Sequence, residues 1–186
     1  PGAALLIQVP AEISGRLSRS NHPAWFSLDA RRGEVFHVEV FAARSGSPAD
    51  LTVNILSSPG ATILASFTDV IPNVGDRRFP TAHTDPAGRW TAPSDGRYLI
   101  AVRDVTGGIA PGGRRVFRLC VQRETTPFDV VAVGRRAAPS NLSVRRGGRE
   151  MYDLIAVRRC GFNGNIHVRA VDLPGGLSCP DVWFGP

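Results

Sequence analysis

The sequence predicts an all-β protein, and three observations support this prediction. Short apolar runs alternate with polar residues, as in strands whose side chains point to opposite faces in turn. The 20 Gly and 15 Pro residues of the 186-residue chain are spread between these runs, where they act as turn residues. No stretch of ten or more residues has helical periodicity. Because a strand and its turn recur about every 8 to 15 residues, we expect a sandwich or a jelly roll.

The clearest strand follows the turn sequence Pro93-Ser94-Asp95-Gly96. Its side chains divide between two faces, Tyr98, Ile100 and Val102 on one, Arg97, Leu99, Ala101 and Arg103 on the other. This alternation is typical of a half-buried strand. Other strands of the first region are expected at 4–9, 24–28, 35–41, 51–56, 63–67, 88–92 and 116–121. Residues 70–86 read as irregular, 106–113 as a Gly-rich loop, and Cys120 is expected to face away from the core.

The organisation predicts a first domain at residues 1–122, a linker at 123–127 and a second β module at 128–186. The linker contains Pro127 and two Thr residues, which favour an extended chain. Strands of the second module are expected at 128–133, 142–145, 151–157, 166–171 and 182–184. This module is small for a sandwich. We expect either that the chain stops inside the second fold or that the module is a half-sandwich docked on the first; the start at Pro1 suggests a mature or excised fragment.

The formal net charge of +6 raises the question of nucleic-acid binding. All 22 basic residues are Arg, however, and six scattered Arg-Arg pairs mostly lie at turns or strand ends. The chain has neither a basic helix nor an aromatic-rich strand interleaved with Arg, as stacking modules need. We therefore expect solvated surface charge and no nucleic-acid partner. No apolar run approaches the roughly 20 residues that span a membrane, so a membrane-spanning chain is not expected.

Sequence motifs of catalysis are missing, so we expect no enzyme. The chain lacks GxSxG, HExxH and GxxxxGK[ST]. His83 and Asp85 lie close together, but in a polar stretch without a partner Ser motif. Cys160 and Cys179 could form a disulfide if the protein is exported, and unpaired thiols are an equally open alternative. No Cys or His cluster has the spacing of a zinc site.

Exposed Trp residues are candidates for stacking on sugar rings. Trp25 is expected in the core, and Trp183 lies next to Phe184 near the end of the sequence. Trp90 lies beside a turn, so we take Trp90 and Arg89 as the candidate ligand-binding residues. Core packing of Trp90 is the favoured alternative.

The order of motifs in the first region resembles the bacterial pre-peptidase C-terminal domain. The matching segments are 13–17, the aromatic strand 25–30 with its turn at 32–34, 43–56 with the turn at Pro59-Gly60, 92–98, and 117–119. Residues 128–186 resemble the immunoglobulin-like module that often follows, through 158–166 and 173–177. The resemblance implies a jelly-roll-like β-sandwich, followed by a second, smaller or incomplete one.

Some members of this family bind calcium through acidic residues near the aromatic strand. The corresponding segment here is Arg19-Ser20-Asn21-His22-Pro23-Ala24, which offers only neutral oxygen ligands and a His. Calcium is therefore disfavoured, and no cofactor is expected. Asp50, Asp69 and Asp85 lie where acidic residues recur in the family. Together they could hold a cation, but capping of turns is favoured.

The resemblance implies an accessory role in a larger exported bacterial protein, located outside the cell, at its surface or in the periplasm. Two hypotheses follow. The first is a non-catalytic module that binds an extracellular polysaccharide or protein matrix, or acts as a spacer beside other domains. The second is a cleavable maturation pro-segment of a secreted peptidase. A third and weaker hypothesis places an active site at residues 70–86.

Overall fold

The computed structural model describes residues 4–17, 22–71, 80–106, 115–124, 128–135, 143–158 and 162–186. The chain divides into two compact units, Pro1–Glu124 and Thr125–Pro186. Apart from the 3-10 turn η1 (Ala43–Ser45), all elements of the described residues are strands, which confirms the all-β prediction. None of these residues forms a helix that is long and apolar enough to cross a membrane.

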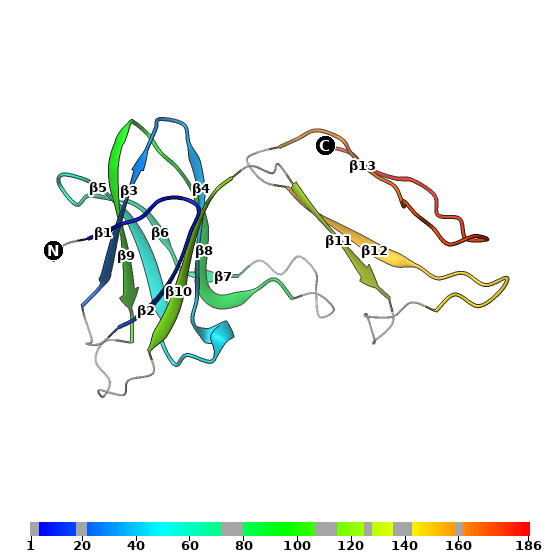
Figure 1. The fold of residues 1–186 in the computed structure, drawn as a ribbon, viewed down its shortest axis with the longest axis horizontal. Coiled ribbons are helices and arrows are strands. Elements are labelled where there is room, and N and C mark those ends of the chain that lie inside the picture. The colour runs from blue at the N-terminus through cyan, green and yellow to red at the C-terminus, as the bar shows by residue number, and fades with distance from the viewer. Residues whose placement is uncertain are drawn as a thin grey trace. The chain divides into compact units, whose positions relative to one another are not determined.

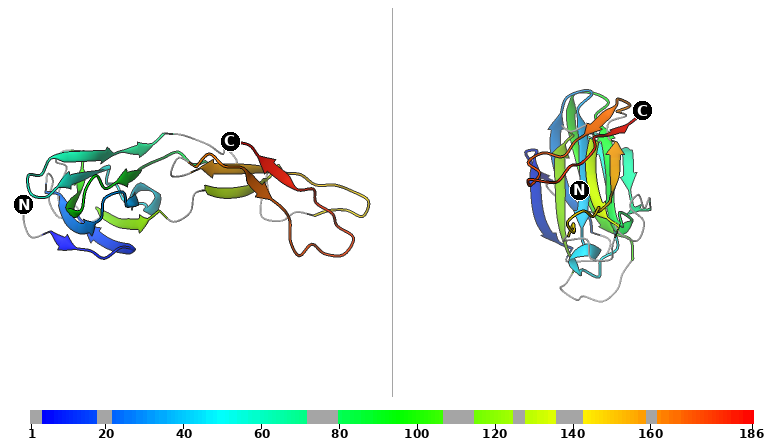
Figure 2. Two further views of the ribbon diagram at one scale, coloured as in Figure 1. Left: turned by 90° about the horizontal axis from the view of Figure 1, so that it is seen from above. Right: turned by 90° about the vertical axis from the view of Figure 1, so that its right-hand side faces the viewer.

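Two five-stranded sheets build the first unit as a sandwich (Figures 1 and 2). The first sheet has the order β1 (Leu5–Leu6), β3 (Ala24–Ala30), β9 (Gly96–Asp104), β5 (Leu51–Ser57) and β6 (Ile63–Phe67). The second sheet has the order β2 (Ala11–Arg16), β10 (Val116–Arg123), β4 (Val35–Phe41), β8 (His83–Thr91) and β7 (Asp69–Val70). All neighbours are antiparallel except β1 and β3, which are parallel.

Alternate residues of both sheets meet in one hydrophobic core. Tyr98, Ile100 and Val102 are buried in it, which confirms the face predicted for the clearest strand. The largest fully buried apolar side chains of the unit are Phe36, Leu28, Ile55, Ile100, Leu119, Val38, Val40, Val53, Val102 and Val121. Each contributes roughly 1.5–3 kcal/mol relative to an exposed position, so this core dominates the stability of the unit.

Two glycines let aromatic rings approach the backbone of the second sheet. Gly15 of β2 pairs with Phe117 of β10, and a Cβ at residue 15 would overlap the Phe117 ring. Gly88 of β8 lies in the same way against Phe67 of β6. Because β6 belongs to the first sheet and β8 to the second, this ring closes the core between the two layers.

Several expected boundaries differ from the structure; the strand expected at 4–9, for example, is the two-residue strand β1. Strand β8 begins at His83 and not at residue 88, because His83 and Pro86 pair with the short strand β7. The register shifts between Asp69 and Val70, and the missing N–H of Pro86 is tolerated at such an irregularity. The strand expected at 142–145 is wrong over its described part: the Gly148 amide donates to the Arg145 carbonyl and closes a turn there. Arg123, expected in the linker, ends β10 and pairs with Phe36.

The described part of the second unit contains two strand pairs. β11 (Phe128–Gly134) pairs with β12 (Tyr152–Arg158), and β13 (Ile166–Val168) pairs with β14 (Val182–Phe184), both antiparallel. β13 is shorter than the strand expected at 166–171. Among the described residues of this unit, the buried apolar side chains are those of Val133 and Ile166. Its exposed large apolar side chains are Val144, Met151, Tyr152, Val171, Leu173, Leu177, Val182 and Trp183.

Candidate functional site

Trp90 is a core residue in the structure, which is the favoured alternative from the sequence; its candidate role as an exposed stacking surface is wrong. Its side chain is 6% exposed. The Phe36 ring stacks on it with centroids 5.7 Å apart, and the Tyr98 ring meets it edge-on at 4.6 Å. Arg89 lies on the opposite, solvent-exposed side of β8, because neighbouring residues of a strand point to opposite faces. The guanidinium of Arg89 pairs with Glu124 at 2.5 Å, so Arg89 and Trp90 do not form one site.

Asp85, which the sequence placed in an irregular stretch, holds the 3-10 turn η1. Its carboxylate accepts hydrogen bonds from the backbone amides of Ala42 at 3.0 Å, Ala43 at 2.6 Å and Arg44 at 3.1 Å. The Nε of Arg44 donates a further bond at 2.8 Å. The side chain is 1% exposed. Asp85 therefore caps a turn, the favoured alternative from the sequence, although it does so from 41 to 43 residues away and not locally.

Arg44 joins this carboxylate to a second one. Its Nη1 lies 2.8 Å from Glu39 Oε1, and its guanidinium carbon lies 4.1 Å from the centre of the Phe41 ring. We call Asp85, Arg44 and Glu39 the Asp85 clamp. Burial alone would raise the pKa of Asp85. The bonds from Arg44 and from the amides of residues 42–44 outweigh burial, so the pKa lies below its ordinary value and Asp85 is ionised at neutral pH.

Asp85 is therefore unsuited to the acid–base pair that its proximity to His83 suggested. Its bonds to the turn and to Arg44 hold it in a structural position. Because these bonds already occupy the carboxylate oxygens of Asp85, Asp85 is not available as a cation ligand together with Asp50 and Asp69. Within the described ranges, no three His, Cys, Asp or Glu side chains group as a metal site.

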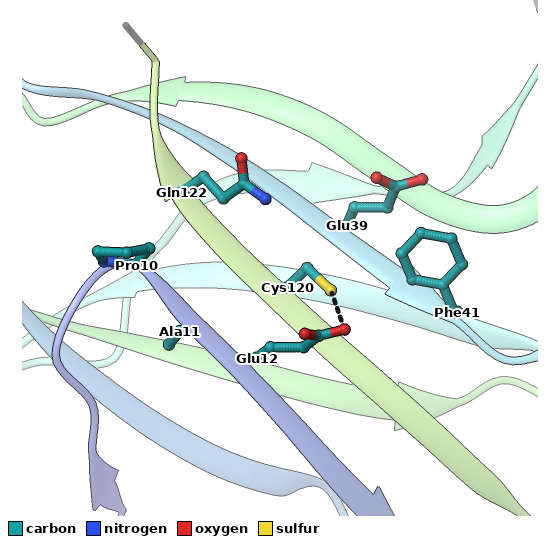
Figure 3. Close-up of a pocket in the computed structure, with 7 residues that line it drawn as sticks. All are labelled: Pro10, Ala11, Glu12, Glu39, Phe41, Cys120 and Gln122. Carbon is teal, nitrogen blue, oxygen red and sulfur yellow. Dashed lines mark hydrogen bonds between the residues drawn. The ribbon is translucent and has the colours of Figure 1, made fainter.

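An open hollow of about 400 Å³ lies on the outer face of the second sheet (Figure 3). Strands β2, β10 and β4 supply its walls, and Glu12, Cys120 and Glu39 stand in one cross-strand row. Cys120 points outward, as predicted from the alternation of β10. The residues that line the hollow are Pro10, Ala11, Glu12, Glu39, Phe41, Cys120 and Gln122.

The charges of this hollow are largely balanced. Glu12 pairs with Arg118 at 2.9 Å, and Glu39 belongs to the Asp85 clamp. The Cys120 sulfur lies 3.9 Å from Glu12 Oε1. Burial raises the pKa of the Cys120 thiol, and the carboxylates of Glu12 and Glu39 raise it further. Because the thiolate is the nucleophilic form, the raised pKa makes the Cys120 thiol less nucleophilic at neutral pH than an ordinary cysteine.

A second exposed feature lies on the β13–β14 pair. Trp183 is 64% exposed, and its indole stacks on the imidazole of His167, with ring centroids 3.9 Å apart and planes 2° from parallel. His167 Nε2 lies 2.7 Å from Asp181 Oδ2. We call these three residues the Trp183 platform. The sequence marked Trp183 as an aromatic candidate, but its pairing with His167 depends on the strand register, which the sequence alone did not show.

The expected disulfide involves a residue outside the described ranges. In the structure Cys179 is a free, exposed thiol. Its expected partner, Cys160, falls in 159–161 and is not described. The bridge therefore stays a prediction.

No protein-family model matches the chain, and no curated protein matches it significantly. Several solved structures do. The pre-peptidase C-terminal domain of a Bacillus anthracis collagenase is 15% identical, covers 66% of this chain and 97% of its own, and has a TM-score of 0.46. PliG of Aeromonas hydrophila, a periplasmic inhibitor of g-type lysozyme, is 16% identical with coverage of 65% and 96% and a TM-score of 0.42. CorA of Methylomicrobium album BG8, a surface-associated copper-binding protein, is 8% identical with coverage of 66% and 98% and a TM-score of 0.41.

The family that the sequence resembles, the pre-peptidase C-terminal domain, is thus found among the structural neighbours. The resemblance of residues 128–186 to an immunoglobulin-like module stays a prediction.

Proposed function

We propose that this chain is a non-catalytic accessory module of a larger exported bacterial protein, and that it binds an extracellular polysaccharide or protein matrix. The observation that carries the proposal is the use of its buried carboxylates. Asp85 is bonded to three backbone amides and to Arg44. Asp104, also buried, accepts from the Thr106 amide at 3.0 Å and pairs with Arg115. Both carboxylates are bonded to backbone amides and to an arginine, and this structural use supports a non-catalytic role.

The surfaces left for recognition are shallow and exposed. The hollow between Glu12 and Glu39 is open to solvent, and the Trp183 indole stands on the outside of its strand pair. Exposed apolar or aromatic groups rimmed by polar ones are typical of interaction sites. An exported location belongs to the same proposal, and the resemblance of residues 1–122 to domains of secreted proteins supports it.

The proposal is tested by sedimentation of the chain with insoluble cellulose, chitin, peptidoglycan and collagen, at low and at high salt. We expect the chain to be retained on at least one matrix and to stay bound at high salt. Salt screens the attraction between exposed charges, whereas a contact made by stacking and hydrogen bonds depends on it less. If the chain is retained on every matrix at low salt and released from every matrix at high salt, the retention comes from the surface charge of the Arg residues, and specific matrix binding is contradicted. A chain that stays in the supernatant throughout would contradict matrix binding and favour the spacer or the pro-segment.

A further inference from the structure

We propose that the Trp183 platform is the saccharide contact of this chain, and that its indole stacks on the apolar face of a pyranose ring in a neutral polysaccharide. This inference rests on the proposed function and names the residues and the ligand class behind it. The first argument is exposure. Trp183 keeps 64% of its surface in solvent, whereas Trp90 keeps 6%. A large aromatic side chain such as Trp is normally packed against other side chains, so an exposed indole on a strand is a candidate contact for a ligand.

The second argument is that the ring is held in place. His167 and Trp183 are directly opposite each other in the β13–β14 register, so their side chains share one face of the pair. The neighbouring cross-strand pair, Ile166 and Phe184, has side chains on the other face, where Ile166 is 1% exposed. The buried Ile166 anchors the strand pair, and the stacked imidazole of His167 limits the motion of the indole. Little conformational entropy is then lost when a ligand binds.

The third argument concerns which face is open. The imidazole of His167 covers one face of the indole at 3.9 Å, which leaves the other face to solvent. The face of an aromatic ring is negative, and the C–H groups on the flat side of a pyranose are weakly positive, so the two surfaces are complementary. A ring supported from behind presents one flat surface, which fits one sugar ring.

The fourth argument is the polar group beside the ring. Asp181 is 47% exposed, and its Oδ2 is bonded to His167 Nε2 at 2.7 Å. A carboxylate in this position accepts hydrogen bonds from sugar hydroxyls at the edge of the stacked ring. The same negative charge disfavours a nucleic-acid phosphate backbone. Cationic ligands are bound in cages with several aromatic walls, whereas the ring contact found for Trp183 is with His167.

The test uses the full chain and soluble probes: cellohexaose, chitohexaose, a muramidase digest of peptidoglycan, and a dT12 oligonucleotide. Binding is measured by calorimetry and by protection of tryptophan fluorescence from acrylamide. We expect one saccharide probe to bind and to protect the exposed tryptophan. Trp183→Ala should weaken that binding at least tenfold, and Trp183→Phe should restore part of it.

Tyr152→Ala is the matched control, because Tyr152 is an exposed aromatic of the same unit and is 52% exposed. It should bind as the unchanged chain does. The NMR signal of the Ile166 methyl groups reports whether the β13–β14 pair is intact in each variant. If Trp183→Ala keeps this signal and binds the saccharide normally, the inference is wrong.

The inference and the proposed function can fail separately. If the chain is retained on a matrix but binds no saccharide probe, or if Trp183→Ala is retained equally well, the platform is not the contact and matrix binding stands. If dT12 binds in a Trp183-dependent way and the saccharides do not, the ligand is a single-stranded nucleic acid and the inference is overturned. If neither the matrices nor the saccharides are bound, both proposals fail.

Discussion

The two units have similar alternating sequences, but their apolar side chains are buried to very different degrees. In the first unit, each five-stranded sheet covers the apolar face of the other, and side chains such as Phe36 and Ile100 are fully buried. In the described part of the second unit, the sheets have two strands each, and Ile166 is the fully buried apolar side chain. Alternation thus predicts which residues share a face, while burial requires a second layer. Within the described residues, the first unit is expected to provide most of the stability.

The largest expected effect is on the free energy of unfolding when one Ile in each unit is shortened to Ala. Ile100→Ala removes a side chain with no exposed surface and should cost about 4 kcal/mol. Ile155→Ala in β12, where the side chain is half-buried, should cost about 1 kcal/mol because less apolar area is lost. Urea unfolding followed by fluorescence and by NMR signals from each unit measures both. Equal losses would mean that the two units are packed alike.

The next effect concerns the Asp85 clamp. Asp85→Ala leaves three backbone amides and Arg44 without their acceptor and should cost about 3 kcal/mol in the free energy of unfolding. Asp29→Ala is the control, since Asp29 also pairs with an arginine, Arg97 at 2.8 Å, but in solvent. This control should leave the unfolding midpoint almost unchanged. A loss for Asp29→Ala as large as that for Asp85→Ala would contradict the structural role of the clamp.

A smaller effect is expected where a glycine meets an aromatic ring. Gly15→Ala forces the Phe117 ring out of its place and should cost roughly 1–3 kcal/mol. Gly175→Ala in the second unit introduces a Cβ with no atom within 4 Å and should be nearly neutral. Thermal unfolding of the two variants gives the comparison. A neutral Gly15→Ala would show that the Phe117 ring moves aside without loss.

The smallest effect is the pH dependence that Asp85 adds. Its pKa is lower in the folded chain than in the unfolded chain, so its contribution is complete above the unfolded value of about 4 and is lost as the pH falls through the folded value. The unfolding midpoint of the unchanged chain should decrease from pH 5 toward pH 2. That decrease should be shallower in Asp85→Asn. Identical slopes in the two proteins would show that Asp85 does not titrate with folding.

Local pattern was enough to predict several strands. The expected bounds of β4 and β6, 35–41 and 63–67, are those of the structure, because alternation and flanking turns are local signals. The start of β8 was missed, since Pro86 normally argues against a strand. The site was harder to predict. Burial of Trp90 depends on Phe36, and the Trp183 platform depends on the register with His167, neither of which is adjacent in sequence.

The contact between Gly15 and Phe117 also constrains how this sequence can change over generations. The two positions lie far apart in the chain but share one volume, because the Phe117 ring fills the space that a Cβ of residue 15 would need. A larger residue at position 15 is expected to cost less once position 117 has become smaller. The two sites are therefore expected to vary together among descendants of this sequence, in an order in which the aromatic ring is lost first.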